Sequence, residues 1–155
     1  MTALERYFDI VQQQIAKLRS TQWPAIARAA EWLGEALATD HWLYAFGTGH
    51  SHALAEEIFY RAGGLAHAVP ILDAKLMLHD NAIEATYLER EEGYAARLLD
   101  LYPVAAGDVL IVASNSGRNF RAKLTAGQET AMPNTQIVFH VNESTSAIWL
   151  AMLMR

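Results

Sequence analysis

The decapeptide WLYAFGTGHS, residues 42–51, decides the fold that this sequence predicts. Its first five residues form a short apolar and aromatic run that ends at a glycine, which is typical of a buried β-strand. The last five form a glycine-rich turn, and we expect a helix from Ser51 to about Ala62, where Gly63 and Gly64 end it. A strand, a small polar turn and a helix in this order predict the first unit of an α/β fold.

A second unit of the same kind follows about 60 residues later. The run VLIVA, residues 109–113, is unbroken and β-branched, as in strands that are covered on both faces. The polar turn SNSGRN, residues 114–119, follows it and leads into a predicted helix over 119–130. Further strands are predicted at 67–71 and 136–141. Strands that alternate with helices predict a parallel sheet, in which ligands bind beyond the carboxyl ends of the strands.

The remaining segments are predicted from their periodicity. Residues 94–102 and 144–153 are expected to be helical, whereas the mixed, polar segment 73–92 is expected to be a loop with at most one helical turn. The last 36 residues offer only one convincing strand, at 136–141, so we expect the C-terminal part of the sheet to be shortened or altered.

The N-terminal region predicts a helical hairpin in front of the α/β core. Residues 4–18 and 21–40 each have helical periodicity, and Ser20 and Thr21 break the pattern between them. The apolar residues of the first helix are spaced four and three apart: Leu4, Phe8, Val11, Ile15 and Leu18. Such a narrow stripe is typical of helical bundles, so we expect it to pack against a second copy of the chain rather than on the sheet.

Length and composition set the class of protein. The chain has 155 residues, a formal charge of −5 and no cysteine, which suits one domain, with a helical pair over 1–40 and an α/β core over 41–155. The absence of cysteine excludes disulfide scaffolds, thiolate metal sites and thiol catalysis. The sequence also has no basic cluster and no apolar run of membrane-spanning length, so nucleic acid and membrane are not expected as partners, and a cytoplasmic location is.

The turn at 47–51 has the composition of an anion site. Gly47 and Gly49 let the backbone approach a ligand closely, and the helix that begins near Ser51 presents free N–H groups and the positive end of its dipole. A dinucleotide fingerprint would require a third glycine where His52 stands, and the lysine of a P-loop is absent. The simpler interpretation is a tight turn in which Ser51 only caps a helix. The hydroxyls and amides of 114–119 are predicted at the same edge of the sheet.

The two turns together resemble the SIS (sugar isomerase) domain family, closest to an uncharacterised bacterial group of single-domain members. The segments FGTGHSH (46–52), GDVLI (107–111) and SNSGRN (114–119) carry the resemblance, which covers about residues 1–119. It implies a flavodoxin-like parallel sheet between layers of helices that binds a phosphorylated sugar or sugar derivative. The N-terminal helices are similar to the dimerising helices of phosphoheptose isomerases, which implies a homo-oligomer.

The resemblance also implies roles for individual residues. Hydroxyls of three serines are expected to contact the phosphate: Ser51, Ser114 and Ser116. Backbone groups, and the side-chain amide of the last residue, are expected from Gly47, Thr48, Gly49, Asn115, Gly117 and Asn119. Phosphoheptose isomerases carry a histidine and a later glutamate on the helix after the first turn, where this chain has Glu57 and Arg61. The zinc site of those enzymes and the catalytic glutamate of the muramic acid etherases therefore do not carry over, and no metal or cofactor is predicted.

Catalysis requires a group that can transfer a proton. A sugar isomerase needs a base that moves a proton between neighbouring carbons, and Glu57 is the first candidate, with Glu92 and His79 behind it. His52 and Glu56, four residues apart, would share one helical face and could form part of a zinc site. The sequence leaves two functions open: a sugar-phosphate isomerase (or lyase), and a non-catalytic sugar-phosphate sensor or binding subunit of a larger assembly.

Overall fold

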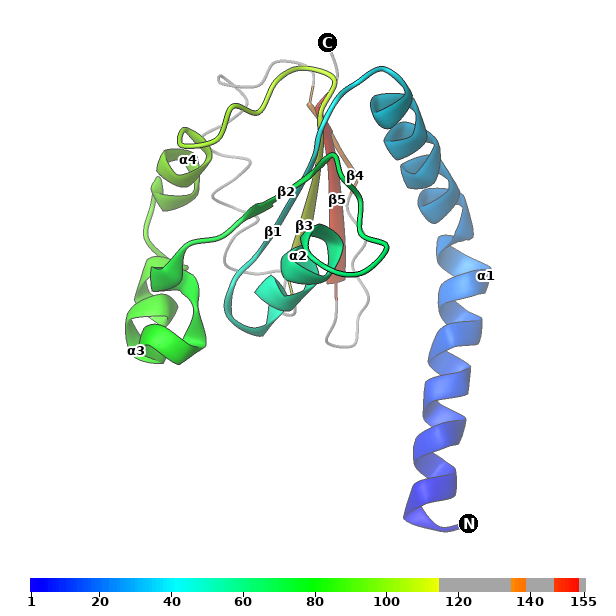
Figure 1. The fold of residues 1–155 in the computed structure, drawn as a ribbon. Helices are drawn as coiled ribbons and strands as arrows, with labels where there is room; N and C mark the ends of the chain where they lie inside the picture. Colours follow the sequence, from blue (N-terminus) through cyan, green and yellow to red (C-terminus); the bar gives the residue numbers. More distant parts are fainter. Residues whose placement is uncertain (115–134, 139–146, 154–155) are drawn as a thin grey trace.

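The computed structural model describes residues 1–114, 135–138 and 147–153, and these form an α/β fold (Figure 1). Five strands form one sheet in the order β2-β1-β3-β5-β4. The strands are β1 (Leu43–Gly47), β2 (Ala68–Ile71), β3 (Val109–Ser114), β4 (Thr135–Val138) and β5 (Ala147–Leu153). β1 pairs in parallel with both β2 and β3, which confirms the predicted parallel core, whereas β5 pairs antiparallel with β3 and β4.

The described helices flank this sheet. They are α1 (Ala3–Ala38), α2 (His52–Phe59), α3 (Leu78–Leu88) and α4 (Tyr94–Leu99), with short 3₁₀ turns η1 (Gly49–Ser51) and η2 (Ala74–Leu76). None of these helices combines the length and the apolar character that crossing a membrane requires.

Side chains alternate between the two faces of the parallel strands and build a core on each. One core joins β1, β2 and β3 to η2 and α4 through Tyr44, Phe46, Ile71, Leu76, Leu98, Leu99, Leu110 and Val112. The other joins β1 and β3 to α1 and α2 through Trp32, Ala36, Leu43 and Val109, with Ile58 and Ile111 packed against them. In Figure 1, α1 and α4 accordingly lie on opposite sides of the sheet. This is the predicted arrangement of a sheet between two layers of helices.

The predicted N-terminal hairpin is wrong, because α1 is one continuous helix of 36 residues with Pro24 inside it. At Ser20 and Thr21, where a break was expected, both hydroxyls donate to the Lys17 carbonyl, at 3.0 and 2.8 Å, and leave the helix intact. Pro24 removes a single helical N–H, and the alanine-rich residues after it favour helix. The result is a rod about 54 Å long at 1.5 Å per residue.

Two further elements differ from the sequence prediction. The segment 73–92, expected as a loop, contains η2 and α3, and Asn81 has non-helical backbone angles inside α3. The Asn81 side chain accepts hydrogen bonds from the backbone of Ile83 and Glu84, so it starts a new helical segment that interrupts the periodicity. Residues 147–153, expected in a helix, form β5, because pairing with β3 outweighs local preference. The predicted helix over 119–130 lies outside the described residues.

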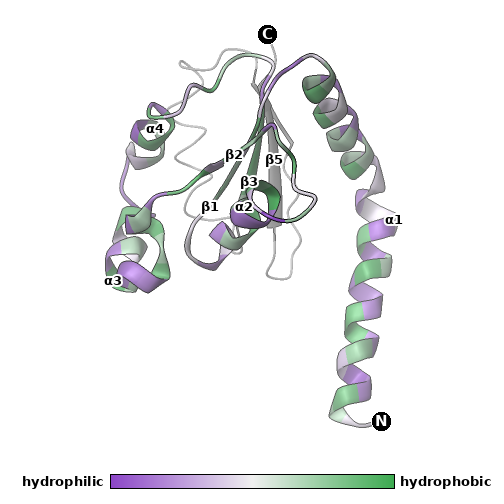
Figure 2. Cartoon of the chain, viewed as in Figure 1, coloured by the Kyte–Doolittle hydropathy of each residue, from purple (hydrophilic) through white to green (hydrophobic). Residues whose placement is uncertain are grey.

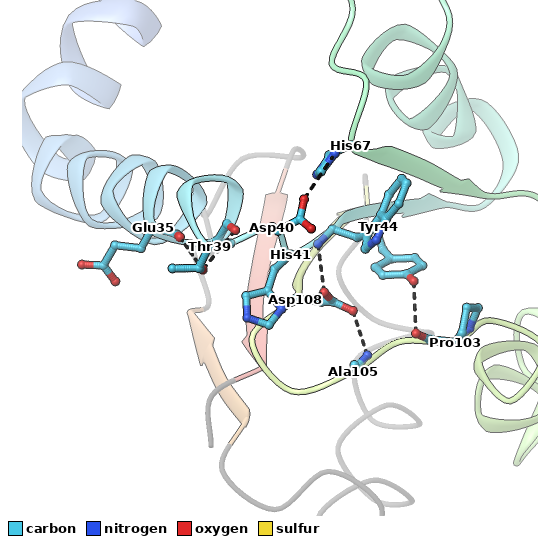
Figure 3. Close-up of polar contacts among 11 residues, drawn as sticks. Glu35, Thr39, Asp40, His41, Tyr44, His67, Pro103, Ala105 and Asp108 are labelled. Carbon is cyan, nitrogen blue, oxygen red and sulfur yellow. Dashed lines mark hydrogen bonds and ion pairs between the residues drawn. The ribbon is translucent and has the colours of Figure 1, made fainter.

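A buried carboxylate holds the sheet together at the amino ends of β1 and β3 (Figure 3). Asp108 is 2% exposed, and its oxygens accept hydrogen bonds from the backbone N–H groups of Trp42, at 2.9 Å, and Ala105, at 2.8 Å. His41 Nδ1 lies 3.5 Å from the same carboxylate. Asp108 therefore ties the end of the α1–β1 connection to the turn that leads into β3.

Replacing this carboxylate should destabilise the fold strongly. Asp108→Ala leaves two N–H groups without their charged acceptor, so we expect the free energy of unfolding to fall by about 3 kcal/mol. Urea denaturation followed by circular dichroism measures this. Asp100→Ala, the same change at an exposed position at the end of α4, should change stability by less than about 0.5 kcal/mol. Equal stabilities for the two variants would contradict the role of Asp108.

Candidate functional site

The candidate site lies where the order of the strands changes direction. From β1 the chain continues to β2 on one side and later to β3 on the other, so β1 and β3 are neighbours at a switch point. Their parallel register pairs Gly47 with Ala113. The chain therefore leaves the sheet at Thr48 and at Ser114 from adjacent positions on one edge, and ligands of such sheets bind beyond this edge.

Two glycines allow the chain to fold back tightly in the turn after β1. A Cβ atom on Gly47 would lie 2.3 Å from the backbone carbonyl oxygen of Ser51, a separation that no side chain can occupy. Gly49 has a φ of +55°, which glycine adopts without strain, and a Cβ atom added to it would lie 3.7 Å from the Leu78 side chain of α3. The turn is thus folded back on itself and supported by α3.

The two hydroxyl side chains of this turn are not used as helix caps. Thr48 occupies the N-cap position of η1 and Ser51 that of α2, but neither side chain accepts a capping hydrogen bond. Ser51 is half-buried, and its N–H donates to the Thr48 carbonyl at 3.0 Å. The interpretation of Ser51 as a mere helix cap therefore loses its main support.

A corner of ionisable side chains adjoins the turn. His52 Nδ1 faces the carbonyl oxygen of Gly49 in a short contact, and because a carbonyl only accepts, Nδ1 is the donor. The other ring nitrogen, Nε2, lies 3.8 Å from a carboxylate oxygen of Glu56, one helical turn further along α2. The ring of His79, from α3, lies 6.1 Å from the ring of His52. We call His52, Glu56 and His79 the histidine corner.

Glu57, the predicted catalytic base, points elsewhere on α2. Its carboxylate forms an ion pair with Arg61 at 2.9 Å, and both side chains are more than half exposed. The role of Glu57 stays a prediction, and its charge is already partly balanced by a neighbour that solvent also reaches.

The other side of the turn borders α4. Thr48 lines a narrow hollow together with Glu89, Glu91 and Tyr94. The hydroxyl of Tyr94 donates to Asp73, which links α4 to η2. Burial, this hydrogen bond and the nearby carboxylates raise the pKa of Tyr94 to about 12, so its hydroxyl keeps its proton and remains a donor at neutral pH. Tyr94 and α3 are parts of the surroundings that the sequence analysis did not single out, and α3 was missed because segment 73–92 has an interrupted periodicity.

Of the predicted site residues, the structure brings Gly47, Thr48, Gly49 and Ser51 together and places Ser114 at the end of the neighbouring strand. Asn115, Ser116, Gly117 and Asn119 lie outside the described residues. Within the described part of the chain, no three His, Asp or Glu side chains gather closely enough to hold a metal ion.

Comparison with known proteins finds matches over most of the chain. A family model described as the SIS domain matches residues 6–128. UPF0309 proteins of Brucella ovis, Brucella canis and Brucella suis are each 46% identical to this chain over 115 residues, which cover 74% of the chain. The same alignment covers 48% of each relative, so the chain spans about half the length of the curated relatives it matches.

Because the chain folds back tightly after β1, replacing glycine by alanine should change stability very differently at two positions. Gly47→Ala forces a methyl group onto the Ser51 carbonyl, so we expect a loss of more than about 1 kcal/mol in the free energy of unfolding. Gly34→Ala, inside α1 with no atom within 4 Å of the added methyl, should instead gain about 0.5–1 kcal/mol. Urea denaturation of both variants tests the turn geometry. A Gly47→Ala variant as stable as the parent would contradict it.

Proposed function

The chain belongs to the SIS domain family, a family of phosphosugar-binding domains, and from this premise we propose that it binds a phosphorylated sugar. The phosphate would lie beyond the carboxyl ends of β1 and β3, between the turn at 47–51 and the segment that begins at Ser114. The half-length match to the curated relatives leaves room for further residues at the site in a longer protein, so the proposal concerns the phosphate end of the ligand.

The observation that carries this proposal is the register of β1 and β3. Gly47 pairs with Ala113, so the two hydroxyl-bearing segments leave the sheet side by side, about 4.8 Å apart as neighbouring strands are. Two segments that begin this close together can both reach a single phosphate group. This supports the sequence prediction that Ser51, Ser114 and Ser116 share one ligand.

Neutral donors would hold the anion. The turn η1 runs directly into α2, and the N–H groups of Ser51 and His52 already donate to carbonyls of the turn, so the backbone donors would be the N–H groups at the start of η1, where the helix dipole adds positive potential. The hydroxyls of Thr48 and Ser51 are not engaged as caps and would add two donors. This arrangement would bind a phosphate without a lysine or arginine from the turn itself.

The reaction that we propose is an aldose–ketose isomerisation of the bound sugar phosphate. It needs a fixed phosphate and one group that moves a proton between neighbouring carbons. His52, Glu56 and Glu57 lie on the helix that follows the phosphate turn, and His79 adjoins them from α3. A protein that binds the same ligand without turnover is the alternative, and it requires only the phosphate site.

We further propose that two copies of the chain pair through α1. Only Trp32 and Ala36 of this helix are buried, both near its C-terminal end, and Figure 1 shows the N-terminal part extending well beyond the sheet. Figure 2 shows hydrophobic residues along this projecting part, between hydrophilic ones. Four members of the predicted stripe are exposed: Leu4 (66%), Phe8 (57%), Ile15 (63%) and Leu18 (48%). Together with the half-buried Val11 they are spaced four and three residues apart, which suits an identical stripe on a second copy.

Ligand binding is tested by thermal unfolding in the presence of sugar phosphates. We expect glucose 6-phosphate, fructose 6-phosphate or sedoheptulose 7-phosphate to raise the melting temperature of the parent, because a ligand that binds only the folded state stabilises it. Ser51→Ala combined with Ser116→Ala should abolish the rise and leave the fold intact. Ser20→Ala, on the exposed surface of α1, serves as the control and should keep it. An unchanged response in the double variant would refute the site.

Pairing through α1 is tested by the mass in solution from light scattering. The parent should be a dimer, and Phe8→Asp combined with Ile15→Asp should be a monomer, because charges in the stripe cannot be buried without partners. Gln13→Asp combined with Ser20→Asp adds the same charge at the same seven-residue separation on the other side of α1, and should remain a dimer. A monomeric parent, or a dimeric Phe8/Ile15 variant, would exclude this interface.

A further inference from the structure

We infer that His52 is the proton-transfer group of the isomerisation, with Glu56 as its positioning residue; this inference rests on the function proposed above. The sequence pattern favoured Glu57 as the base. In the structure, the group next to the phosphate turn with a defined orientation is His52, the first residue of α2.

The backbone of the turn fixes the His52 ring. Nδ1 donates to the Gly49 carbonyl, so in the neutral imidazole the free lone pair lies on Nε2. The His52 side chain is only 17% exposed, which limits the rotation of the ring. The same peptide segment would therefore hold both the phosphate and the base, and this is the condition for bringing a base and a reacting carbon together reproducibly.

Glu56 supplies what the base needs after it has taken a proton. Its carboxylate lies 3.8 Å from Nε2, which carries no proton in the neutral ring and so has none to donate, and at this distance the carboxylate stabilises the charge of an imidazolium. Glu57 has no such relation to the turn, because Arg61 holds it at 2.9 Å on an exposed part of α2. His79 faces His52 from α3 and closes the corner on that side.

The proton transfer requires no reagent other than His52 and the sugar phosphate. Nε2 of His52 removes the proton from the carbon next to the carbonyl of the open-chain sugar phosphate, and the electrons of that C–H bond form the double bond of an enediol. The imidazolium returns its proton to the neighbouring carbon, while the hydroxyl proton passes from one oxygen to the other. An aldose phosphate thereby becomes a ketose phosphate. The inferred substrates are sugar phosphates that reach an open-chain form with a carbonyl at the first or second carbon.

The experiment is the incorporation of solvent deuterium into the carbon next to the carbonyl, followed by proton NMR with the three sugar phosphates named above. Loss of a general base costs roughly 100-fold or more, so His52→Ala should slow the exchange by that factor. It should keep the thermal stabilisation by the same sugar phosphates. Added imidazole should restore part of the rate, which it would not do if His52 only supported the fold. His67→Gln, at the opposite end of the sheet beside Trp42, is the control and should exchange at the parent rate.

Glu56→Gln provides a second test, on an exposed side chain whose replacement should leave folding unchanged. It should lower kcat by about tenfold with little change in KM, because it acts through His52 rather than on the ligand. This variant decides the matter if His52→Ala does not fold.

Several results would overturn the inference. Exchange that persists within threefold in His52→Ala would do so, and so would a loss confined to Glu57→Gln, which would return the role to Glu57. A parent that gains thermal stability from the sugar phosphates but exchanges no deuterium would exclude the inferred base while the binding function stands. A parent that shows neither response would remove the proposed function itself.

Discussion

The buried carboxylate of Asp108 is the interaction on which the arrangement of the central strands depends. It binds the backbone N–H of Trp42, immediately before β1, and that of Ala105, before β3. The Val109 N–H in turn donates to the Trp42 carbonyl at 2.9 Å. Because strands advance in step once their register is set, these bonds at the amino ends also determine which residues are neighbours at the carboxyl ends. The pairing of Gly47 with Ala113, and with it the candidate ligand site, follows from the anchoring at the other end of the sheet. Burial raises the pKa of Tyr44, and the negative charge of Asp108 raises it further, so the carboxylate also acts on a core side chain.

The candidate site concentrates its polar groups where the backbone, rather than long side chains, positions them. Gly47 allows the chain to fold back toward Ser51, and the carbonyl of Gly49 accepts a hydrogen bond from the His52 ring. Binding an anion through backbone amides and short hydroxyl side chains costs the protein little conformational entropy, because the turn already fixes these groups. Such a site is compatible with a chain of formal charge −5, because its local potential comes from helix geometry and not from the net charge.

The sequence predicted the parts of the fold that are encoded locally. β1 and β3 are continuous apolar runs that end at polar turns, and both appear where expected. α1 was predicted as two helices because Pro24 and two hydroxyl residues are ordinary signs of a helix end. In the structure, the two hydroxyls donate to the Lys17 carbonyl within the continuous helix instead of capping a new one. β5 was missed because a strand at this position is stabilised by its partner β3 rather than by its own residues. In the site, the turn residues were predictable from composition. The contact of His52 with His79 was not, because it depends on α3, whose periodicity is interrupted at Asn81.

Because α1 is attached to the sheet only near its C-terminal end, its local stability differs along its length. Trp32 and Ala36 pack against the sheet, so the last turns of the helix can open only when a core also opens. The first turns rest on a capping box between Thr2 and Glu5 and on no buried side chain, so they can fray at the small cost of an isolated helix. The free energy needed to open α1 thus rises from its N-terminal end, which frays locally, to its C-terminal end, which opens only with the domain. Any surface that covers the free end would make that end unfold together with the domain.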